Sequence, residues 1–410
     1  MTPFQKPGKK LQPMNTQLIE TTFWIFLSIV FYTYIGYGIL LYILVWFKRR
    51  INPLKKLPPS NFEPHITLLV AAYNEKDFVN QKVLNTKSLD YPSDKIHQIW
   101  ITDGSTDGTP DILTTYSDVK VYHENERKGK IAAMNRGMQY VTTDIVIFSD
   151  ANTLLGSQSV RKIVQLFENP KTGCVSGEKR IVNKDSDAAA GAGEGIYWRY
   201  ESTLKKWDAE LYSVVGAAGE LFAIRTHLYQ EVEPDTILDD FVISLRIAMQ
   251  GYTIQYDPDA YAIENSSANV NEERKRKIRI AAGGIQSIIR LLPLLNIFKY
   301  GILSFQYISH RVLRWTLTPL LLPWLPLLNL LLIRSSAVYQ FLFILQFIFY
   351  VAAFIGWLFR YKKTKFKLTF ISYYFFMMNY SVYQGFTRFL KNTQSVQWER
   401  ARRADAQPQV

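Results

Sequence analysis

The segment His65-Ile-Thr-Leu-Leu-Val-Ala-Ala72 is a short apolar run with turn-forming residues on either side. Apolar runs of this length between turn residues are typical of a strand that is buried on both faces. The polar turn Tyr73-Asn-Glu75 follows directly, so hydrogen-bonding side chains come where the strand ends. The same pattern recurs further along the chain.

Such runs alternate with stretches of helical pattern over residues 65–167. Further strands are predicted at 98–102, 120–122 and 144–149, and helices at 78–88, 109–116, 131–140 and 157–167. Strands that alternate with helices at this spacing form right-handed crossovers and a mostly parallel sheet covered on both faces. Ligands of such sheets bind beyond the carboxyl ends of the strands. We therefore predict an α/β fold with its binding site at that edge.

An acidic turn, Asp103-Gly-Ser-Thr-Asp-Gly-Thr109, follows the strand predicted at 98–102. Its residues are ordinary turn formers and helix caps. An exposed carboxylate at a strand end can also accept hydrogen bonds from a ribose or a base. Both interpretations of Asp103 stay open on the residues alone.

A basic turn, Arg127-Lys-Gly-Lys130, precedes the helix predicted at 131–140. Basic surface turns are usually solvated. Lys130 would nevertheless lie at a helix amino terminus, where free amide groups and the helix dipole favour anions. A solvated turn and a phosphate contact are both compatible with this segment.

Asp150-Ala-Asn152 follows the strand predicted at 144–149. Two oxygen-bearing side chains after a buried strand suit a hard divalent cation, which keeps several waters and uses substrate phosphates as ligands. The alternative is an Asx turn, which carries weight because Asn152 is a neutral ligand. Asp150 and Asn152 are thus candidate metal ligands.

Two adjacent acids, Asp239 and Asp240, open the helix predicted at 241–250. Acids in a first helical turn stabilise the helix against its dipole, which explains them without a function. Adjacent carboxylates also repel each other, so that one takes a raised pKa, as a general base requires. Between the acidic regions, Gly216-Ala-Ala-Gly-Glu220 is either a tight packed bend or a close backbone approach to a ligand.

Apolar stretches flank this region. Residues 21–47 carry no charge and exceed the roughly 20 residues that span hydrocarbon, whereas signal-peptide cores run about 7–15, so we expect a retained anchor. Uncharged stretches at 315–333 and 335–359 predict two more spans. The stretch 368–387 contains polar residues, and both a spanning helix and an interfacial or re-entrant helix remain open.

The net charge of +13 is concentrated beside these stretches. Basic residues gather at 48–56, 274–279 and 360–367, as Lys and Arg do on the cytoplasmic flanks of membrane helices. We therefore expect no nucleic-acid partner, a cytosolic segment from 52 to about 273 and an external amino terminus. The single cysteine, Cys174, excludes an internal disulfide and fits a reducing compartment.

The motif Arg311-Val-Leu-Arg314-Trp315 abuts the span predicted at 315–333. Arg and Trp at headgroup level need no role beyond anchoring. Anchoring is the better interpretation of these residues taken alone.

Taken together in this order, the motifs resemble membrane-bound family 2 glycosyltransferases. This inverting GT-A group includes cellulose, chitin, hyaluronan and poly-N-acetylglucosamine synthases. The likeness runs from Pro64 to Trp315 and includes the flanking spans. No single motif is decisive, but the ordered set is specific. It implies a hexosyltransferase with a GT-A domain and transmembrane helices at both ends.

The resemblance sets the expected domain organisation. The parts are a tail at 1–20, a transmembrane helix at 21–47, a basic and proline-rich linker at 48–63, a cytosolic GT-A domain at 64–273, interfacial helices at 274–314, about three transmembrane helices at 315–390 and a tail at 391–410.

The resemblance also implies roles for individual residues. Asp240 matches the last acid of a TED-like motif and would be the catalytic base. Asp150 matches the first acid of the DxD motif, which holds Mg²⁺ or Mn²⁺ with the diphosphate, and Asn152 would be a further metal ligand. Arg314 and Trp315 match the end of the QxxRW motif. The residues expected to bind substrate are Glu75, Asp103, Lys130, Asp150, Asp239, Gly219, Glu220, Arg311, Arg314 and Trp315.

Two positions depart from the family pattern. Asn152 replaces the second acid of the DxD motif, which predicts weaker metal binding or a backbone oxygen ligand. Arg311 stands where the family usually has Gln, which disfavours a processive polymer.

We expect inverting transfer from a nucleotide-sugar, such as a UDP-sugar, to a glycan or lipid-linked acceptor for polysaccharide synthesis. The bilayer would be a bacterial-type inner or plasma membrane. Transfer of one sugar to a lipid carrier and a catalytically silent scaffold are the alternatives. A second copy of the chain or a secretion partner would complete a channel for the glycan.

Overall fold

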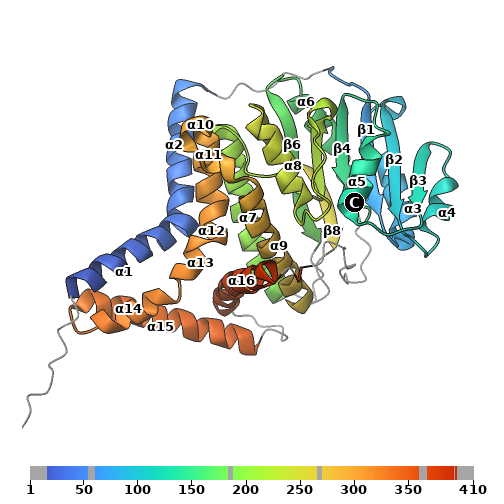
Figure 1. Ribbon diagram of the computed structural model, residues 1–410. Helices are drawn as coiled ribbons and strands as arrows, with labels where there is room; N and C mark the ends of the chain where they lie inside the picture. Colours follow the sequence, from blue (N-terminus) through green and yellow to red (C-terminus); the bar gives the residue numbers. More distant parts are fainter. Residues whose placement is uncertain are drawn as a thin grey trace, which may run out of the picture.

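The computed structural model describes residues 16–53, 61–182, 188–265, 270–359, 367–391 and 393–394. A sheet with its covering helices forms one side of the molecule, and helices from both ends of the sequence form the other (Figure 1). Most of the predicted tails at 1–20 and 391–410, and the middle of the predicted linker at 48–63, lie outside the described residues.

Eight strands form one sheet in the order β3-β2-β1-β4-β7-β6-β8-β5. The four strands predicted from the sequence are confirmed, and they run parallel to one another: β1 (Ile66–Ala72), β2 (Ile96–Asp103), β3 (Val119–Glu124) and β4 (Ile145–Ser149). In the register, Ile66 pairs with Ile96 on one side and with Ile145 on the other. The carboxyl ends of these strands therefore share one edge of the sheet.

The other half of the sheet is mixed, which the sequence did not reveal. Its strands are β5 (Leu154–Leu155), β6 (Thr172–Val182), β7 (Leu221–Arg225) and β8 (Thr253–Asn265). β7 runs antiparallel between β4 and β6, β8 runs parallel to β6, and β5 runs antiparallel to β8. The sheet is thus mostly parallel in the predicted half and reverses direction at β7.

Alternate residues of the central strands supply two apolar cores. Leu68 and Val70 of β1 belong to the cluster on one face, and Leu69 belongs to the cluster on the other. Burial on both faces explains why β1 reads as a continuous apolar run instead of an alternating one. The helices that pack on the two faces are α3 (Lys76–Lys87), α4 (Thr109–Thr114) and α6 (Ser159–Leu166) on the first, and α5 (Lys130–Met138) and α8 (Asp239–Met249) on the second.

The amino-terminal span is longer than the predicted stretch of 21–47. α1 (Thr16–Phe31) and α2 (Tyr37–Ile51) are joined by one π-helical turn, Tyr32–Gly36, and together run from Thr16 to Ile51. Figure 1 shows that α1 and α2 point in different directions at this turn. A π-helical insertion bends a helix because it interrupts the regular hydrogen-bond ladder.

The carboxyl-terminal helices differ from a row of simple spans. The span predicted at 315–333 is instead a broken pair, Ile302–Trp315 and Leu317–Leu332, with a bend of 42°. The pair comprises α11 (Ile302–Tyr307), a π-helical turn (Ile308–Val312), α12 (Leu313–Trp315), α13 (Leu317–Leu321) and α14 (Trp324–Leu332). Trp315 therefore ends the first arm and does not begin a span.

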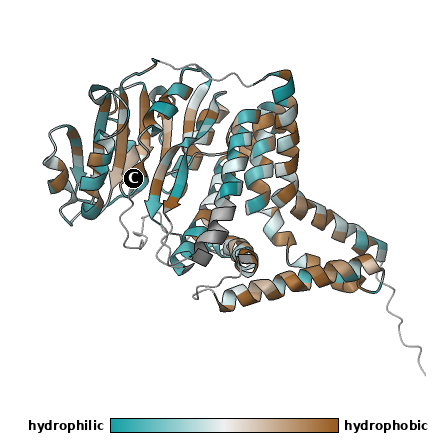
Figure 2. Cartoon of the chain, turned by 180° about the vertical axis from the view of Figure 1, so that it is seen from behind, coloured by the Kyte–Doolittle hydropathy of each residue, from teal (hydrophilic) through white to brown (hydrophobic). Residues whose placement is uncertain are grey.

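Two helices of the described chain, Thr16–Ile51 and α15 (Ala337–Leu358), are long and apolar enough to cross a membrane, and the broken pair is a third if it counts as one span. Only 11% of the most apolar stretch of α15 is buried within the protein. The helices farthest from the sheet, α14 and α15, are drawn mostly in the brown of hydrophobic residues (Figure 2). These features indicate a membrane protein.

Three further helices connect the sheet to this apolar part. They are α7 (Ala188–Leu211), α9 (Val270–Arg290) and α16 (Lys367–Leu390). α2 packs on α7, and α16 packs on both α9 and α15. A Cβ on Gly385 of α16 would lie 2.6 Å from Cβ of Ala281, so α16 and α9 approach closely. The predicted interfacial segment 274–314 thus contains a long helix that also packs on the site described below.

Candidate active site

The turns after β1 and β2 are joined by hydrogen bonds. The amide of Asn74 donates to Oγ of Ser105 (3.1 Å), and Oδ1 of Asn74 accepts from the amide of Thr106 (2.9 Å). Asn74 has a φ of 53°, a left-handed conformation that Asn adopts more readily than most residues. Glu75 is buried next to it, and its amide donates to Oγ1 of Thr109 (2.9 Å). The two turns expected to bind the nucleotide therefore lie together.

Asp103 is buried at the end of β2, whereas the sequence suggested an exposed carboxylate. Its Oδ2 accepts from the amide of Gly129 at 2.6 Å, and both of its oxygens accept from the amide of Lys128 at 3.1 Å. Gly129 has a φ of 99°, which favours glycine, and Lys130 follows as the first residue of α5. Asp103 thus orients the basic turn that carries Lys130.

Lys130 lies between two acids from different elements. Its Nζ is 2.7 Å from Oδ1 of Asp150 and 3.7 Å from Oδ2 of Asp239. Burial acts to lower the pKa of Lys130, but the carboxylates of Asp150 and Asp239 outweigh it and raise that pKa above its ordinary value. Lys130 therefore stays protonated and links the end of β4 to the start of α8.

Asp240 lies in the first turn of α8, next to Asp239. Burial, together with the charge of Asp239, raises the pKa of Asp240 to about 7. A carboxyl group with this pKa takes up and releases a proton near neutral pH, as a general base must. The repulsion expected between the adjacent carboxylates is thus one of the causes of this shift.

The segment before β7 approaches Asp240 closely. A Cβ on Gly219 would lie 3.2 Å from Oδ2 of Asp240, so the glycine leaves room for the carboxylate. The next residue, Glu220, accepts a hydrogen bond from Nζ of Lys179 at 2.5 Å. Burial acts to raise the pKa of Glu220, but the charge of Lys179 outweighs it and lowers that pKa well below its usual range. Glu220 therefore adds a fixed negative charge near Asp240.

We expect the substitution Gly219→Ala to reduce transfer about tenfold. The added methyl group would displace the Asp240 carboxylate by a few tenths of an ångström, and such misplacement costs rate when a reaction depends on alignment. Steady-state kinetics on the purified variant would show the loss in kcat. The matched control is Ala218→Ser, a change of similar size at the residue before Gly219. Another glycine, Gly251, is unsuitable as a control because its φ of 92° would strain an alanine. Equal kcat for Gly219→Ala and wild type would contradict the close approach.

The motif 311–315 binds a buried acid of α7. Nη2 of Arg311 lies 2.6 Å from Oε1 of Glu201, and Nη1 of Arg314 lies 2.9 Å from Oε2. The ring of Trp315 instead packs on Phe241, the residue after Asp240, with ring centres 5.3 Å apart. Of these three residues predicted to bind substrate, Trp315 therefore lies against the residue that follows Asp240, and both arginines contact Glu201.

Several buried charges in this region carried no signal in the sequence. Lys179 of β6 contacts Glu220 and Glu264, and Glu201 contacts both arginines. Lys82 of α3 is fully buried and donates to Oγ of Ser149 at 2.7 Å. Burial lowers the pKa of Lys82 to about 7, against the opposing charge of Asp150. Each contact joins segments far apart along the chain, so no local pattern could have indicated it.

Asp150 and Asn152 follow β4, as predicted, and they fit a hard divalent cation. Oδ1 of Asn152 is buried and has no hydrogen-bond partner in the described structure, which suits an oxygen that can serve as a metal ligand. Among the described residues, no three His, Cys, Asp or Glu side chains gather into a complete metal site. A cation here would therefore take few protein ligands and complete its coordination with water and substrate phosphates.

The predicted acids thus converge from separate elements. Lys130 contacts Asp150 and Asp239, Asp240 follows Asp239, and Asp103 binds the amide next to Lys130. The site combines a fixed cation, a carboxyl group that titrates near pH 7 and oxygen ligands for a metal. This arrangement can bind a diphosphate and remove a proton from a hydroxyl group.

The chain is similar to a known domain family and to curated proteins. The family model described as Glycosyl transferase family 2 matches residues 67–232. A poly-beta-1,6-N-acetyl-D-glucosamine synthase from Staphylococcus aureus is 28% identical over 256 residues, which cover 60% of this chain and 61% of that protein. The synthase of the same name from Staphylococcus epidermidis is 28% identical over 233 residues, or 55% of this chain and 56% of that protein. The chain thus spans less than two thirds of the length of these relatives.

A solved structure has the same fold. It is a mannosyltransferase from Pyrobaculum calidifontis in complex with GDP-Man and Mn²⁺, with a TM-score of 0.66 and 21% sequence identity over 92% of this chain and 100% of that one. Residues 67–232 therefore match a family 2 glycosyltransferase domain, and the chain has the GT-A fold with apolar helices at both ends.

Proposed function

We propose that the protein is an inverting, membrane-bound glycosyltransferase that moves a sugar from a nucleotide-sugar to a hydroxyl group of a glycan or lipid-linked acceptor. The observation that carries the proposal is the contact of Lys130 with both Asp150 and Asp239, next to an Asp240 whose pKa is about 7. A fixed cation beside a titratable carboxylate supplies what this reaction needs, namely charge for a diphosphate and a base for the acceptor.

The reaction would proceed in one displacement. Asp240 takes the proton of the acceptor hydroxyl while that oxygen forms a bond to the anomeric carbon. The bond from the anomeric carbon to the diphosphate breaks on the opposite face, and the electron pair leaves with the nucleoside diphosphate. Lys130 stabilises the charge that grows on this leaving group, because a preorganised cation in a buried site needs little rearrangement.

The proposed cofactor is Mg²⁺ or Mn²⁺, held by Asp150 and by the buried Oδ1 of Asn152. When bound, it would act as a Lewis acid on the diphosphate. Support for a metal comes from this donor set and from the Mn²⁺ in the structure of the Pyrobaculum mannosyltransferase.

The remaining substrate roles are proposals of the same kind. Glu75 and Asp103 would contact the nucleotide. The site around the base would be shaped by Asp239, Gly219 and Glu220. Trp315 would face the acceptor, with Arg311 and Arg314 behind it. The catalytic domain would be cytosolic, and the acceptor would approach from the bilayer side.

The decisive experiment is a donor panel. Membranes that contain the protein are incubated with labelled nucleotide-sugars, including UDP-N-acetylglucosamine and GDP-mannose, with and without Mn²⁺. We expect one donor to label a lipid-soluble or polymeric product, and a size ladder would indicate a polymer. A single lipid-soluble species would indicate transfer of one sugar. No transfer and no hydrolysis from any donor would reject the proposal in favour of a scaffold.

The rate should depend on pH as the pKa of Asp240 dictates. The base is ionised only above its pKa of about 7, so kcat/KM should fall tenfold per pH unit below that value. Asp239→Asn removes one charge that raises this pKa, and the acidic limb should therefore move to lower pH. A pH profile of initial rates at fixed ionic strength measures both effects. A limb that stays in place in the variant would show that Asp239 does not influence the base.

A further inference from the structure

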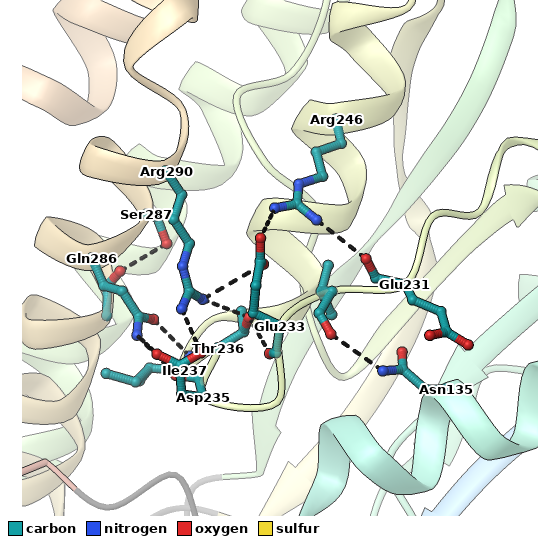
Figure 3. Close-up of polar contacts among 12 residues, drawn as sticks. Asn135, Glu231, Glu233, Asp235, Thr236, Ile237, Arg246, Gln286, Ser287 and Arg290 are labelled. Carbon is teal, nitrogen blue, oxygen red and sulfur yellow. Dashed lines mark hydrogen bonds and ion pairs between the residues drawn. The ribbon is translucent and has the colours of Figure 1, made fainter.

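The loop that precedes the acidic pair is held by three helices. Figure 3 shows the segment from Glu231 to Ile237 between α9, α8 and α5. From α5, Nδ2 of Asn135 donates to the carbonyl oxygen of Val232 at 3.2 Å. From α8, Nη2 of Arg246 lies 2.6 Å from Oε1 of Glu233. The contacts from α9 fall closest in sequence to Asp239 and Asp240, the first residues of α8.

Two side chains of α9 bind the last residues of this loop. Arg290 donates from Nη1 to Oγ1 of Thr236 and from Nη2 to Oδ1 of Asp235, both at 2.6 Å. Gln286 donates from Nε2 to the carbonyl oxygen of Asp235 (2.8 Å) and accepts at Oε1 from the amide of Ile237 (3.0 Å). Its amide therefore fixes the backbone on both sides of Thr236, which is itself buried.

The contacts of Gln286 and Arg290 with residues 235–237, called the α9 clamp below, are more than a surface ion pair. Asp235 is 67% exposed, and an exposed pair by itself contributes little. Ile237, however, is only 6% exposed, and its amide donates to Oε1 of Gln286, so loss of Gln286 would leave this buried amide without that hydrogen bond. The clamp thus fixes the backbone conformation of the residues that lead into Asp239.

The glycines of α9 fix the residues on either side of the acidic pair. A Cβ on Gly283 would lie 2.7 Å from side-chain atoms of Ile237 and Leu238, so this glycine permits the loop to pack on the helix. A Cβ on Gly284 would lie 2.6 Å from the ring of Trp315, which packs in turn on Phe241. Leu238, the residue before Asp239, therefore packs directly on α9, and Phe241, the residue after Asp240, is linked to α9 through Trp315.

We propose that α9 is the positioning element for the catalytic base, with Arg290 and Gln286 as positioning residues that act through the backbone of 235–238. The inference rests on the proposed function of Asp240. Because α16 packs on α9 through Gly385 and Ala281, the same helix ties the base to the membrane-side part of the protein.

The test compares Arg290→Ala with Arg246→Ala in the full-length protein. Both arginines bind the same loop, but the loop residues that Arg246 contacts in the described structure are Glu231 and Glu233, further from the acids. We expect Arg290→Ala to lower kcat 10- to 100-fold, to leave KM for the donor within threefold, and to move the acidic limb of the pH profile to lower pH as Asp240 becomes more hydrated. Arg246→Ala should stay within threefold of wild type with an unchanged limb.

Conservative replacement separates positioning from simple loss of fold. Lys at position 290 can hold Asp235 or Thr236 but not both, so Arg290→Lys should recover part of kcat. Equal effects of Arg290→Ala and Arg246→Ala, or an Arg290→Ala defect confined to KM, would overturn the proposal.

Hydrogen–deuterium exchange provides a readout that needs no activity. In Arg290→Ala, amides of residues 235–240 should exchange faster, while those of β1 and β4 keep their wild-type protection. Arg246→Ala should leave residues 235–240 unchanged. If wild type transfers no sugar, the proposed function fails, and exchange still decides whether the clamp exists. Unchanged exchange at 235–240 in Arg290→Ala would reject the clamp whatever the activity.

Discussion

Asp240→Asn is expected to lower the transfer rate by about 10²–10⁴-fold, the contribution of a positioned general base. Asn has nearly the same shape as Asp but cannot take the proton of the acceptor. The substitution also removes a negative charge next to Asp239, so the contact of Lys130 with Asp150 and Asp239 should be kept. Binding of the nucleoside diphosphate should therefore remain close to wild type.

Two measurements on purified protein test this expectation. Label transfer gives kcat, and isothermal titration with UDP or GDP gives the affinity for the nucleotide product. Asp118→Asn is the matched control, because Asp118 is half exposed and its ion-pair partner in the described structure is Lys87. The residual rate of Asp240→Asn should also lose the acidic limb near pH 7. Transfer at the wild-type rate would show that another group is the base.

The half of the fold that sequence could predict is the half with local signals. β1 and β4 are short apolar runs, each followed by a polar turn, and burial on both faces makes such runs visible. The end of a strand fixes where its next residue lies, and parallel neighbours end at the same edge of a sheet. The positions of Asp103 and Asp150 at one sheet edge therefore follow from local sequence.

The strands of the second half of the sheet could not be predicted from the sequence, because they contain charged residues that are buried in the fold. β6 contains Lys179, which contacts Glu220 and Glu264 from segments far along the chain. A lysine within a strand reads as exposed unless its partners are known, and pairing across such separations has no local signature. The contacts of Arg311 and Arg314 with Glu201 escaped prediction for the same reason.

Hydropathy could not predict the break in the helix at Thr316 either. Uncharged residues continue without interruption from 315 to 333, so apolar length alone predicts one straight span. The structure bends there by 42°, after Trp315 packs on α9 and Phe241. Packing against neighbouring elements sets the direction of a helix, and that information is absent from a count of apolar residues.

Lys130→Met should cost more stability than any other single change at the site, about 3–5 kcal/mol. The variant leaves Asp150 and Asp239 buried, at 10% and 9% side-chain exposure, without the cation that lies between them. Removing one partner of a buried pair is strongly destabilising because the remaining charge has lost its water as well as its counterion. Donor binding should be lost in the same variant, because Lys130 is the proposed contact of the diphosphate.

The stability loss should depend on pH in a defined direction. Burial already raises the pKa of Asp150 above its ordinary value against the opposing charge of Lys130, so loss of Lys130 should raise that pKa further in the folded variant. The folded variant then keeps a proton up to a higher pH than the folded wild type does, so its stability relative to wild type falls as pH rises through that range. The difference in Tm between wild type and Lys130→Met should therefore be larger at pH 8 than at pH 5.

Thermal unfolding in detergent at the two pH values measures this difference. Lys128→Met is the control from the same turn, since Lys128 is 49% exposed and contacts Glu124 and Glu126 at the surface. Its expected loss of Tm is small, with little dependence on pH. Similar losses of Tm in the two variants would show that Lys130 does not hold the buried acids in their charged form. The same conclusion would follow if the difference in Tm between wild type and Lys130→Met did not increase with pH.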